Sequence, residues 1–325
     1  MQADWRPGAG IEALRLRARL NHCIRAFFES RGVLEVETPL MSAAGNTEPN
    51  IRSFALDYSG PHAGGSRRRY LRTSPEFPLK RLLAAGIGDC YELGRVFRDG
   101  ECGGRHNPEF TMLEWYRLGI DHYRLMDEVA ELLCAVFALL GRTLKLRRSS
   151  YRDLFREHVG IDPALASEDE LRAALSGHDI DASGLERDDW LDLLLTHRIE
   201  PALPRDELLL LYDFPASQCA LARVVGEGAE AHACRFEAYV GGVELANGYH
   251  ELSDAREQRA RFERDNQRRR ARGDTPLPLD EHLLAALEHG LPDCAGVALG
   301  VDRLMMLLSG SKRIDQVIAF AGPRA

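Results

Sequence analysis

The chain has 325 residues, of which 45% are hydrophobic and 28% charged, and its formal net charge is −8 at pH 7. This composition is typical of a globular protein and excludes a disordered chain, a collagen and a small disulfide-rich scaffold. The seven cysteines form no C-x-x-C pair, so the pattern suggests neither a disulfide framework nor a zinc site. The chain lacks the net positive charge that is typical of nucleic-acid-binding proteins, although the sequence is compatible with a local basic patch.

No targeting or membrane segment is visible in the sequence. The first residues, Met1-Gln2-Ala3-Asp4-Trp5, contain no apolar signal core. The longest apolar run, residues 132–140, is about half as long as a membrane-spanning helix requires. We therefore expect a cytoplasmic protein in a reducing compartment, without membrane association.

The first 140 residues predict helices alternating with short strands. Apolar residues at helical spacing, among them Leu20, Ile24 and Phe28, predict a helix over 11–31, and Gly32 suits the position after its end. The elements expected next are strands 33–36, 52–58 and 69–72, the last two around a glycine-rich turn at 60–65. They are followed by a helix with Pro75 in its first position and a stop at Gly86, a hairpin of strands 90–97 and 110–116 around the polar loop 98–109, and a helix over 121–140.

The remainder of the chain predicts an insertion and a second hairpin. Residues 141–205 are charged, helix-prone and without motifs, so we interpret them as a helical insertion within a single domain spanning 1–325. Strands 236–240 and 243–245 flank Gly241-Gly242, a pair typical of a two-residue hairpin turn. The other expected elements are strand 208–212, helix 254–272, helix 281–289, strand 297–301 and helix 302–309. Antiparallel hairpins with helices at their ends indicate an α+β fold.

The helix predicted over 254–272 is rich in arginine. The simplest interpretation is a solvated face, and a contact with RNA or with a protein is the alternative. The pattern G-x-x-x-x-G-K-[ST] does not occur, which excludes a Walker-type nucleotide site.

The hairpin loop after residue 97 is the first candidate for chemistry. Arg98 stands where a strand meets the loop, and Arg105 and His106 follow within it. Cations held at a strand end suit a polyphosphate, because guanidinium groups match pairs of phosphate oxygens. Phe110 offers a flat face for a base. The alternative is a hairpin whose charges are only solvated.

The second candidate is a pair of carboxylates, Glu244 and Glu251, which are seven residues apart. On an uninterrupted strand, an odd separation places two residues on opposite faces. Asn247-Gly248 is a bend or bulge signal that would bring both carboxylates to one side. Acids near a phosphate-binding arginine suit Mg²⁺, which takes a few carboxylates together with phosphate oxygens. The alternative is two surface glutamates.

The third candidate is the junction of the last strand with the last helix, residues 296–304. Small residues such as Gly300 allow a close approach of the backbone to a ligand, and Arg303 could reach a phosphate from the start of the helix. The alternative is a tightly packed junction in which Arg303 pairs with Asp302.

Together these segments resemble the class II aminoacyl-tRNA synthetases. Thr38-Pro39-Leu40 is similar to motif 1 of that class, Phe97-Arg98 with the loop to Phe110 to motif 2, and residues 300–303 (Gly-Val-Asp-Arg) to motif 3. Residues 105–112 and 244–251 narrow the resemblance to the lysyl-tRNA synthetase branch. It covers nearly the whole chain and implies an antiparallel sheet flanked by helices.

Motif 1 begins within forty residues of Met1, which we interpret as the absence of the anticodon-binding domain of a lysyl-tRNA synthetase. Truncated lysyl-synthetase-like chains of this length form the family of elongation factor P–(R)-β-lysine ligases. Ser74 and Ala298, where lysyl-tRNA synthetases usually carry Ala and Gly, also resemble that family. One departure lies in motif 2, whose pattern is Arg-x-Glu: here Gly100 takes the third position, and Glu101 or a backbone carbonyl is expected to contact the adenine amino group instead.

The resemblance implies a two-step ligase that uses ATP and Mg²⁺. It activates (R)-β-lysine as an adenylate and transfers it to a lysine of elongation factor P. The catalytic residues implied are Arg98 on the α-phosphate and Arg303 on the distal phosphates. The wider ATP-binding set comprises Arg98, Asp99, Gly100, His106, Asn107, Phe110, Glu244, Leu245, Gly300 and Arg303. Glu244 and Glu251 are the implied Mg²⁺ ligands, and the residues implied for the amino acid are Ser74, Glu76, Glu114, Tyr116, Glu251 and Ala298.

The partners expected from the resemblance are elongation factor P, β-lysine and a second copy of the chain in a homodimer, with no tRNA. Two alternatives remain open at this point. One is a truncated synthetase paralogue that activates α-lysine for another acceptor. The other is a non-catalytic synthetase-like regulator, which would be expected to have lost the phosphate-binding arginines or the acids. This sequence retains the two arginines and the two acids, namely Arg98, Arg303, Glu244 and Glu251.

Overall fold

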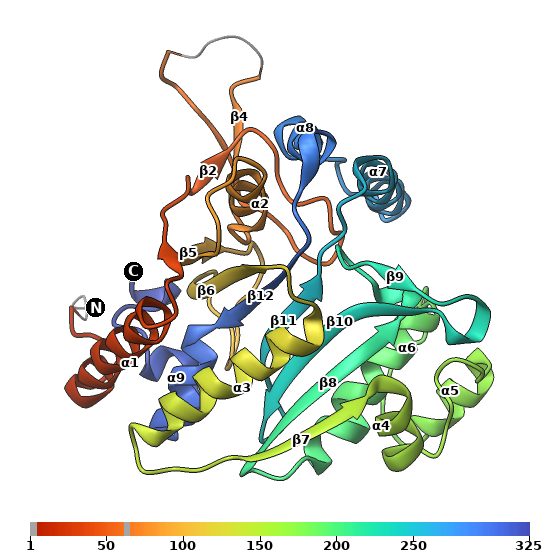
Figure 1. Cartoon of the computed structure of the whole chain (residues 1–325). Helices are drawn as coiled ribbons and strands as arrows, with labels where there is room; N and C mark the ends of the chain where they lie inside the picture. The colour runs from red at the N-terminus through yellow and green to blue at the C-terminus, as the bar shows by residue number, and fades with distance from the viewer. Residues whose placement is uncertain (1–4, 62–65) are drawn as a thin grey trace. The chain divides into compact units, whose positions relative to one another are not determined.

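The computed structural model describes residues 5–61 and 66–325 (Figure 1). They form two compact units, which are described separately. The first unit comprises Met1–Gly119, Ser253–Cys294 and Ala298–Ala325, and the second comprises Ile120–Leu252 and Ala295–Val297. Most of the glycine-rich turn predicted at 60–65 lies outside the described residues.

Two sets of strands organise the first unit. Strand β5 (Cys90–Phe97) pairs in parallel with β1 (Leu34–Glu35) and antiparallel with β6 (Glu109–Leu118). A smaller sheet has the order β2-β4-β3 and consists of β2 (Met41–Ser42), β4 (Arg68–Leu71) and β3 (Ala55–Asp57). The helices of this unit are α1 (Ile11–Glu29), α2 (Glu76–Ala84), α7 (Ala255–Ala271), α8 (Glu281–Gly290) and α9 (Val301–Ser309). Strand β12 (Cys294–Gly300) is divided between the two units.

Helix α1 confirms the prediction made from its apolar spacing. Leu20, Ile24 and Phe28 are fully buried on one face of the helix. Phe28 stacks on Tyr91 of β5, with ring centroids 4.4 Å apart. Gly32 has a φ of +67°, a conformation that favours glycine and ends the helix. The periodicity of the sequence therefore specified both the helix and its buried face.

The start of helix α2 differs by one residue from the prediction. Pro75 caps the helix instead of occupying its first turn, and the helix begins at Glu76. The reason is the Ser74 hydroxyl, which accepts a hydrogen bond from the backbone N–H of Glu76 at 2.9 Å. A side-chain oxygen thus satisfies a backbone donor that the first turn leaves unpaired.

Strands of mixed direction form the sheet of the second unit, in the order β11-β10-β8-β7. Strand β10 (His232–Val240) is antiparallel to β11 (Val243–His250), to β8 (Glu207–Pro215) and to the short β9 (Val224–Val225). The predominance of antiparallel hairpins in both units confirms the predicted α+β class. Helix α3 (His122–Ala138) also confirms its prediction and begins after Asp121, whose carboxylate accepts the N–H of Arg124.

Residues 141–205 contain helices, as predicted, but begin with a strand. Strand β7 (Lys145–Ser150) pairs in parallel with β8, so the prediction of helix for these residues is wrong. The segment is polar and largely exposed, and its strand conformation comes from backbone pairing with β8 rather than from an apolar face. The helices that follow are α4 (Tyr151–His158), α5 (Glu168–Ala174), α6 (Arg187–Leu194) and the short turns Leu195–Ile199 and Glu200–Ala202.

Large side chains from these helices and from β8 form the core of the second unit. Trp190 and Phe155 are buried in it, and Tyr151 stacks on Phe155 with a centroid distance of 4.5 Å. Among the described residues, no helix combines the length and apolarity needed to cross a membrane. All seven cysteines lie in the described part of the chain and are free thiols.

Candidate active site

The β5–β6 hairpin of the first unit positions the predicted phosphate-binding arginine. Its register pairs Val96 with Phe110, so Phe110 lies at the loop end of the hairpin, near Arg98. The Arg98 guanidinium lies over the Phe110 ring, 5.1 Å from its centroid, and its Nη1 donates to Glu101 Oε1 at 3.3 Å. The Nε of Arg98 is buried and has no hydrogen-bond partner among the described residues. A buried donor left without an acceptor is costly, which favours an anion bound at this place.

The loop between the two strands is held by backbone contacts at both ends. The N–H of Arg98 donates to Pro108 O at 2.9 Å, and that of Asp99 donates to Arg52 O at 2.8 Å. Asp99 and Gly100 are exposed, and Gly100 has a φ of +83°. Glycine at this turn therefore meets a backbone requirement that the glutamate of the family pattern would strain.

Asn107 is buried in the same loop, and its side chain serves the loop itself. Its Nδ2 donates to Glu109 O at 2.6 Å, and its Oδ1 accepts the N–H of Gly322 at 3.0 Å. The side-chain amide is thus engaged by the protein. If Asn107 contacts the adenine base, its backbone makes the contact, as the resemblance implies.

Arg303 stands in the first turn of α9 and faces the loop. Its Nη2 donates to Nε2 of the exposed His106 at 2.7 Å, which brings these two predicted residues together. Asp302, by contrast, forms an ion pair with Arg17 and accepts the N–H of Thr111 at 2.6 Å. The alternative in which Arg303 pairs with Asp302 is therefore wrong, because the carboxylate is used to hold α1 and β6 to α9. Gly300 caps α9, and Ala298 and Gly300 are partly exposed on β12.

A buried carboxylate with two hydroxyl donors lies on the same hairpin. The Ser74 hydroxyl donates to Glu114 Oε2 at 2.6 Å, and the Tyr116 hydroxyl donates to Glu114 Oε1 at 2.9 Å. Glu114 is only 2% exposed. Glu76, two residues after Ser74, accepts a hydrogen bond from the buried Lys80 at 2.7 Å. The structure thus brings together three of the residues predicted for the amino acid, around a carboxylate suited to an amine.

One buried ion pair next to this hairpin was not identified from the sequence. Arg72 and Glu92 are each 5% exposed in their side chains, and their Nη2 and Oε1 atoms are 2.6 Å apart. Thr38 of the motif 1 segment donates to Glu92 Oε2 at 2.7 Å, which ties that segment to β5. A Cβ on Gly94 would lie 2.6 Å from Arg72 Nη2. Glycine inside a strand is the sequence signal that could have indicated this close approach.

The second unit carries Glu244, Leu245 and Glu251 on or directly after β11. The bend predicted at Asn247-Gly248 is wrong, because both residues pair regularly with β10. Gly248 is required for another reason, since a Cβ there would lie 2.5 Å from the Phe236 ring. The irregularity comes earlier: Ala246 pairs with Ala238 and Glu244 with Tyr239, so the buried Leu245 is an extra residue. This bulge reverses the alternation and sets Glu244 on the face of Asn247 and Tyr249. Glu251 follows the end of the strand and forms an isolated bridge with Ala222.

That face of the second unit holds a buried charge network. Arg235 Nη2 and Glu237 Oε1 are 2.5 Å apart, and Tyr239 donates to the other oxygen of Glu237. Arg235 also donates to Asn247 Oδ1 at 3.2 Å. Burial raises the pKa of Glu237 against the opposing effect of Arg235, and the charge of Glu244 raises that pKa further. A further cation near Glu244 would relieve this repulsion between carboxylates.

Sequence reasoning missed Arg235, Glu237 and Tyr239. Their alternate spacing on a strand places them on one face, and this period of two was the available signal.

Comparison with known proteins identifies the family. The model of the family described as tRNA synthetases class II (D, K and N) matches residues 3–324. The chain therefore belongs to the class II tRNA synthetase family. Its relatives within that family include the elongation factor P–(R)-β-lysine ligases of Vibrio parahaemolyticus and Vibrio vulnificus, each 48% identical over all of both chains. The enzyme of the same name from Klebsiella pneumoniae is 49% identical over 99% of both chains.

Proposed function

We propose that this protein is an ATP-dependent ligase that activates (R)-β-lysine and transfers it to a lysine side chain of elongation factor P. The observation that carries the proposal is the identity of about half of all residues, over the full length, with ligases of that name. The site in the first unit supports it, because the buried Nε donor of Arg98 has no acceptor within the described residues 5–61 and 66–325.

The first step joins the carboxylate of β-lysine to the α-phosphorus of ATP and releases pyrophosphate. The carboxylate is already ionised, so the protein supplies no nucleophile and acts through positioning and charge stabilisation. We assign Arg98 to the α-phosphate and Arg303, with His106, to the distal phosphates. Phe110 stacks on the adenine, and the backbone of Asn107 contacts its edge. Asp99 and Gly100 shape the loop, while Gly300 and Leu245 allow close approach of the nucleotide.

The carboxylates of the second unit fit a divalent cation. Glu244 lies on the face that contains Glu237, and Glu251 directly follows the end of the same strand. Carboxylate oxygens are the ligands that Mg²⁺ prefers. We propose that Glu244, with Glu251, holds Mg²⁺, which neutralises phosphate charge when bound. The repulsion that Glu244 exerts on Glu237 supports this assignment.

The amino acid requires anionic or polar partners for two amines. We propose Glu114, with its donors Ser74 and Tyr116, together with Glu76 and Glu251 as these partners, and Ala298 as a residue that shapes the pocket. Moving an amine from the α to the β carbon alters pocket shape by about one methylene, which is worth only about 1–3 kcal/mol of discrimination. Small differences such as Ser74 and Ala298 are of a size that could set this preference.

In the second step, the lysine amine of elongation factor P attacks the acyl carbon of the adenylate, loses a proton to solvent and releases AMP. We further propose a cytoplasmic homodimer that does not charge tRNA. The seven free thiols suit a reducing compartment. The net charge of −8 opposes binding of a polyanion.

Pyrophosphate exchange tests the substrate directly. The enzyme is incubated with ATP, Mg²⁺ and labelled pyrophosphate, with (R)-β-lysine in one series and α-lysine in another. We expect the ratio of kcat to KM to be higher for (R)-β-lysine. A higher value for α-lysine would favour the paralogue that activates α-lysine, and no exchange with either would favour the non-catalytic regulator.

A further inference from the structure

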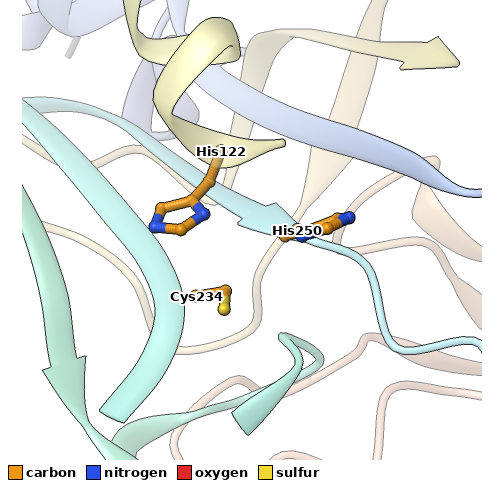
Figure 2. Close-up of side chains that lie close together, drawn as sticks. All are labelled: His122, Cys234 and His250. Atoms are coloured by element: carbon orange, nitrogen blue, oxygen red, sulfur yellow. The ribbon is translucent and has the colours of Figure 1, made fainter. Parts of the chain in front are cut away.

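Three side chains with metal-binding chemistry meet in the second unit, away from the network around Glu237. His122 begins α3, Cys234 lies on β10, and His250 ends β11 (Figure 2). One ligand atom from each residue lies within 4.8 Å of the others. The β10–β11 register pairs Arg235 with Tyr249, and Cys234 and His250 are the next residues on these two neighbouring strands.

The cluster is enclosed by the protein. His122 is 3% exposed and Cys234 is 5% exposed, while His250 is partly buried. The His122 and His250 rings are 6.5 Å apart between centroids, with an interplanar angle of 26°. Two imidazoles and a thiol therefore converge from three separate elements in a setting with little access to solvent.

A carboxylate orients one of the imidazoles. Asp213 Oδ1 lies 3.2 Å from His122 Nε2, and the Tyr123 hydroxyl donates to the same carboxylate at 2.9 Å. Asp213 has a φ of +56°, a strained backbone conformation for a residue with a side chain, which the surrounding contacts maintain. When Nε2–H of His122 donates to Asp213, its Nδ1 carries the lone pair. That Nδ1 is buried and has no hydrogen-bond partner among the described residues.

A histidine held by a carboxylate through one nitrogen, with the other nitrogen available, is the usual arrangement of a metal-ligating imidazole. The combination of two nitrogens and one sulfur suits Zn²⁺ and does not suit Mg²⁺ or Ca²⁺, which prefer oxygen. Zinc bonds of about 2.0–2.3 Å require ligand atoms about 3.5 Å apart. The ligand atoms now lie within 4.8 Å of one another, and small rotations of the side chains would bring them to the separation that zinc requires.

We propose that His122, Cys234 and His250 bind one Zn²⁺ ion, with Asp213 orienting His122 and water or Asp213 completing the coordination. The ion would join the start of α3 to β10 and β11, so its role is structural and separate from the ligase chemistry. The Cys234 thiol proton passes to solvent as the zinc–sulfur bond forms.

Metal titration of the full chain tests the proposal. Protein stripped with a chelator is titrated with Zn²⁺ against a chromophoric competitor, and with Co²⁺, whose bond to a thiolate gives a charge-transfer band in the near ultraviolet. We expect one Zn²⁺ per chain, the thiolate band with Co²⁺, and a higher melting temperature with Zn²⁺. The variants His122→Gln and Cys234→Ala should bind Zn²⁺ at least tenfold more weakly, and Asp213→Asn should bind it about 10–100-fold more weakly.

A matched control is Cys90→Ala, because Cys90 is an equally enclosed free thiol on β5 of the first unit. This variant should keep wild-type zinc affinity. The proposal is overturned if wild-type protein gives no thiolate band with Co²⁺, a result that does not depend on the folding of any variant. It is also overturned if folded Cys234→Ala and His122→Gln bind Zn²⁺ as tightly as the wild type, since the metal would then lie elsewhere.

Discussion

Replacing Arg98 by alanine should slow adenylate formation by about 10²–10³ and leave the fold intact. The side chain makes an ion pair with Glu101 at 3.3 Å, and the two side chains are 23% and 29% exposed. A partly solvated pair of this kind contributes about 0–1 kcal/mol to the free energy of unfolding. Removal of one preorganised contact to a developing charge costs about 10²–10³ in rate, or about 3–4 kcal/mol of barrier. We therefore expect a near-normal unfolding midpoint and a loss of pyrophosphate exchange of that size.

Arg72→Ala is the matched comparison, because this arginine is structural. It pairs with Glu92 at 2.6 Å, with both side chains 5% exposed, and donates to Thr38 Oγ1 at 2.7 Å. Its loss leaves a buried carboxylate without its cation, which costs about 3–5 kcal/mol.

Urea unfolding and pyrophosphate exchange are measured for both variants. The assignment of Arg98 to phosphate is refuted if folded Arg98→Ala exchanges pyrophosphate at nearly the wild-type rate. It is equally refuted if Arg98→Ala loses as much stability as Arg72→Ala, since a structural role would then explain the loss of activity.

Three further predictions concern stability and assembly. Asp302→Ala should lower the free energy of unfolding by about 3–5 kcal/mol, because Arg17 loses its carboxylate partner and the Thr111 N–H loses its acceptor. An unchanged urea midpoint would contradict this prediction. Burial raises the pKa of Asp162, but hydrogen bonds, chiefly from Arg152, outweigh burial and hold it below its ordinary value of 3.8. Asp162→Asn should therefore destabilise the protein at pH 7 by about 1 kcal/mol, since solvent screens the pair, and the difference from wild type should shrink as the pH falls below about 4. A difference that stays constant with pH would count against that ion pair. Light scattering at micromolar concentration should give the mass of a dimer, and a monomer would contradict the proposed assembly.

Elements with complete local signals were predictable from the sequence. Helix α1 has an apolar face and a terminal glycine, α3 has Asp121 as its cap, and the β5–β6 hairpin alternates around a polar loop. Strand β7 was not predictable, because its charged, exposed residues have no apolar periodicity and depend on pairing with β8.

The candidate site divides in the same way. The neighbourhood of Arg98 and Phe110 follows from a single hairpin, so the sequence was sufficient to predict it. The bulge at Leu245 was not predictable, because it is a property of the register between two strands and Leu245 has no turn propensity of its own. The cluster of His122, Cys234 and His250 was missed because its members are far apart in sequence and match no short metal-binding pattern.

Acceptor modification tests the central proposal most directly. Purified protein is incubated with ATP, Mg²⁺ and (R)-β-lysine, with either elongation factor P or lysine tRNA as acceptor. Intact-mass spectrometry follows the factor, and acid gels follow the tRNA. The proposed function predicts that the factor gains the mass of one β-lysyl group, that a variant of the factor lacking its acceptor lysine does not, and that tRNA stays uncharged. Charging of tRNA with no gain in mass of the factor would contradict it.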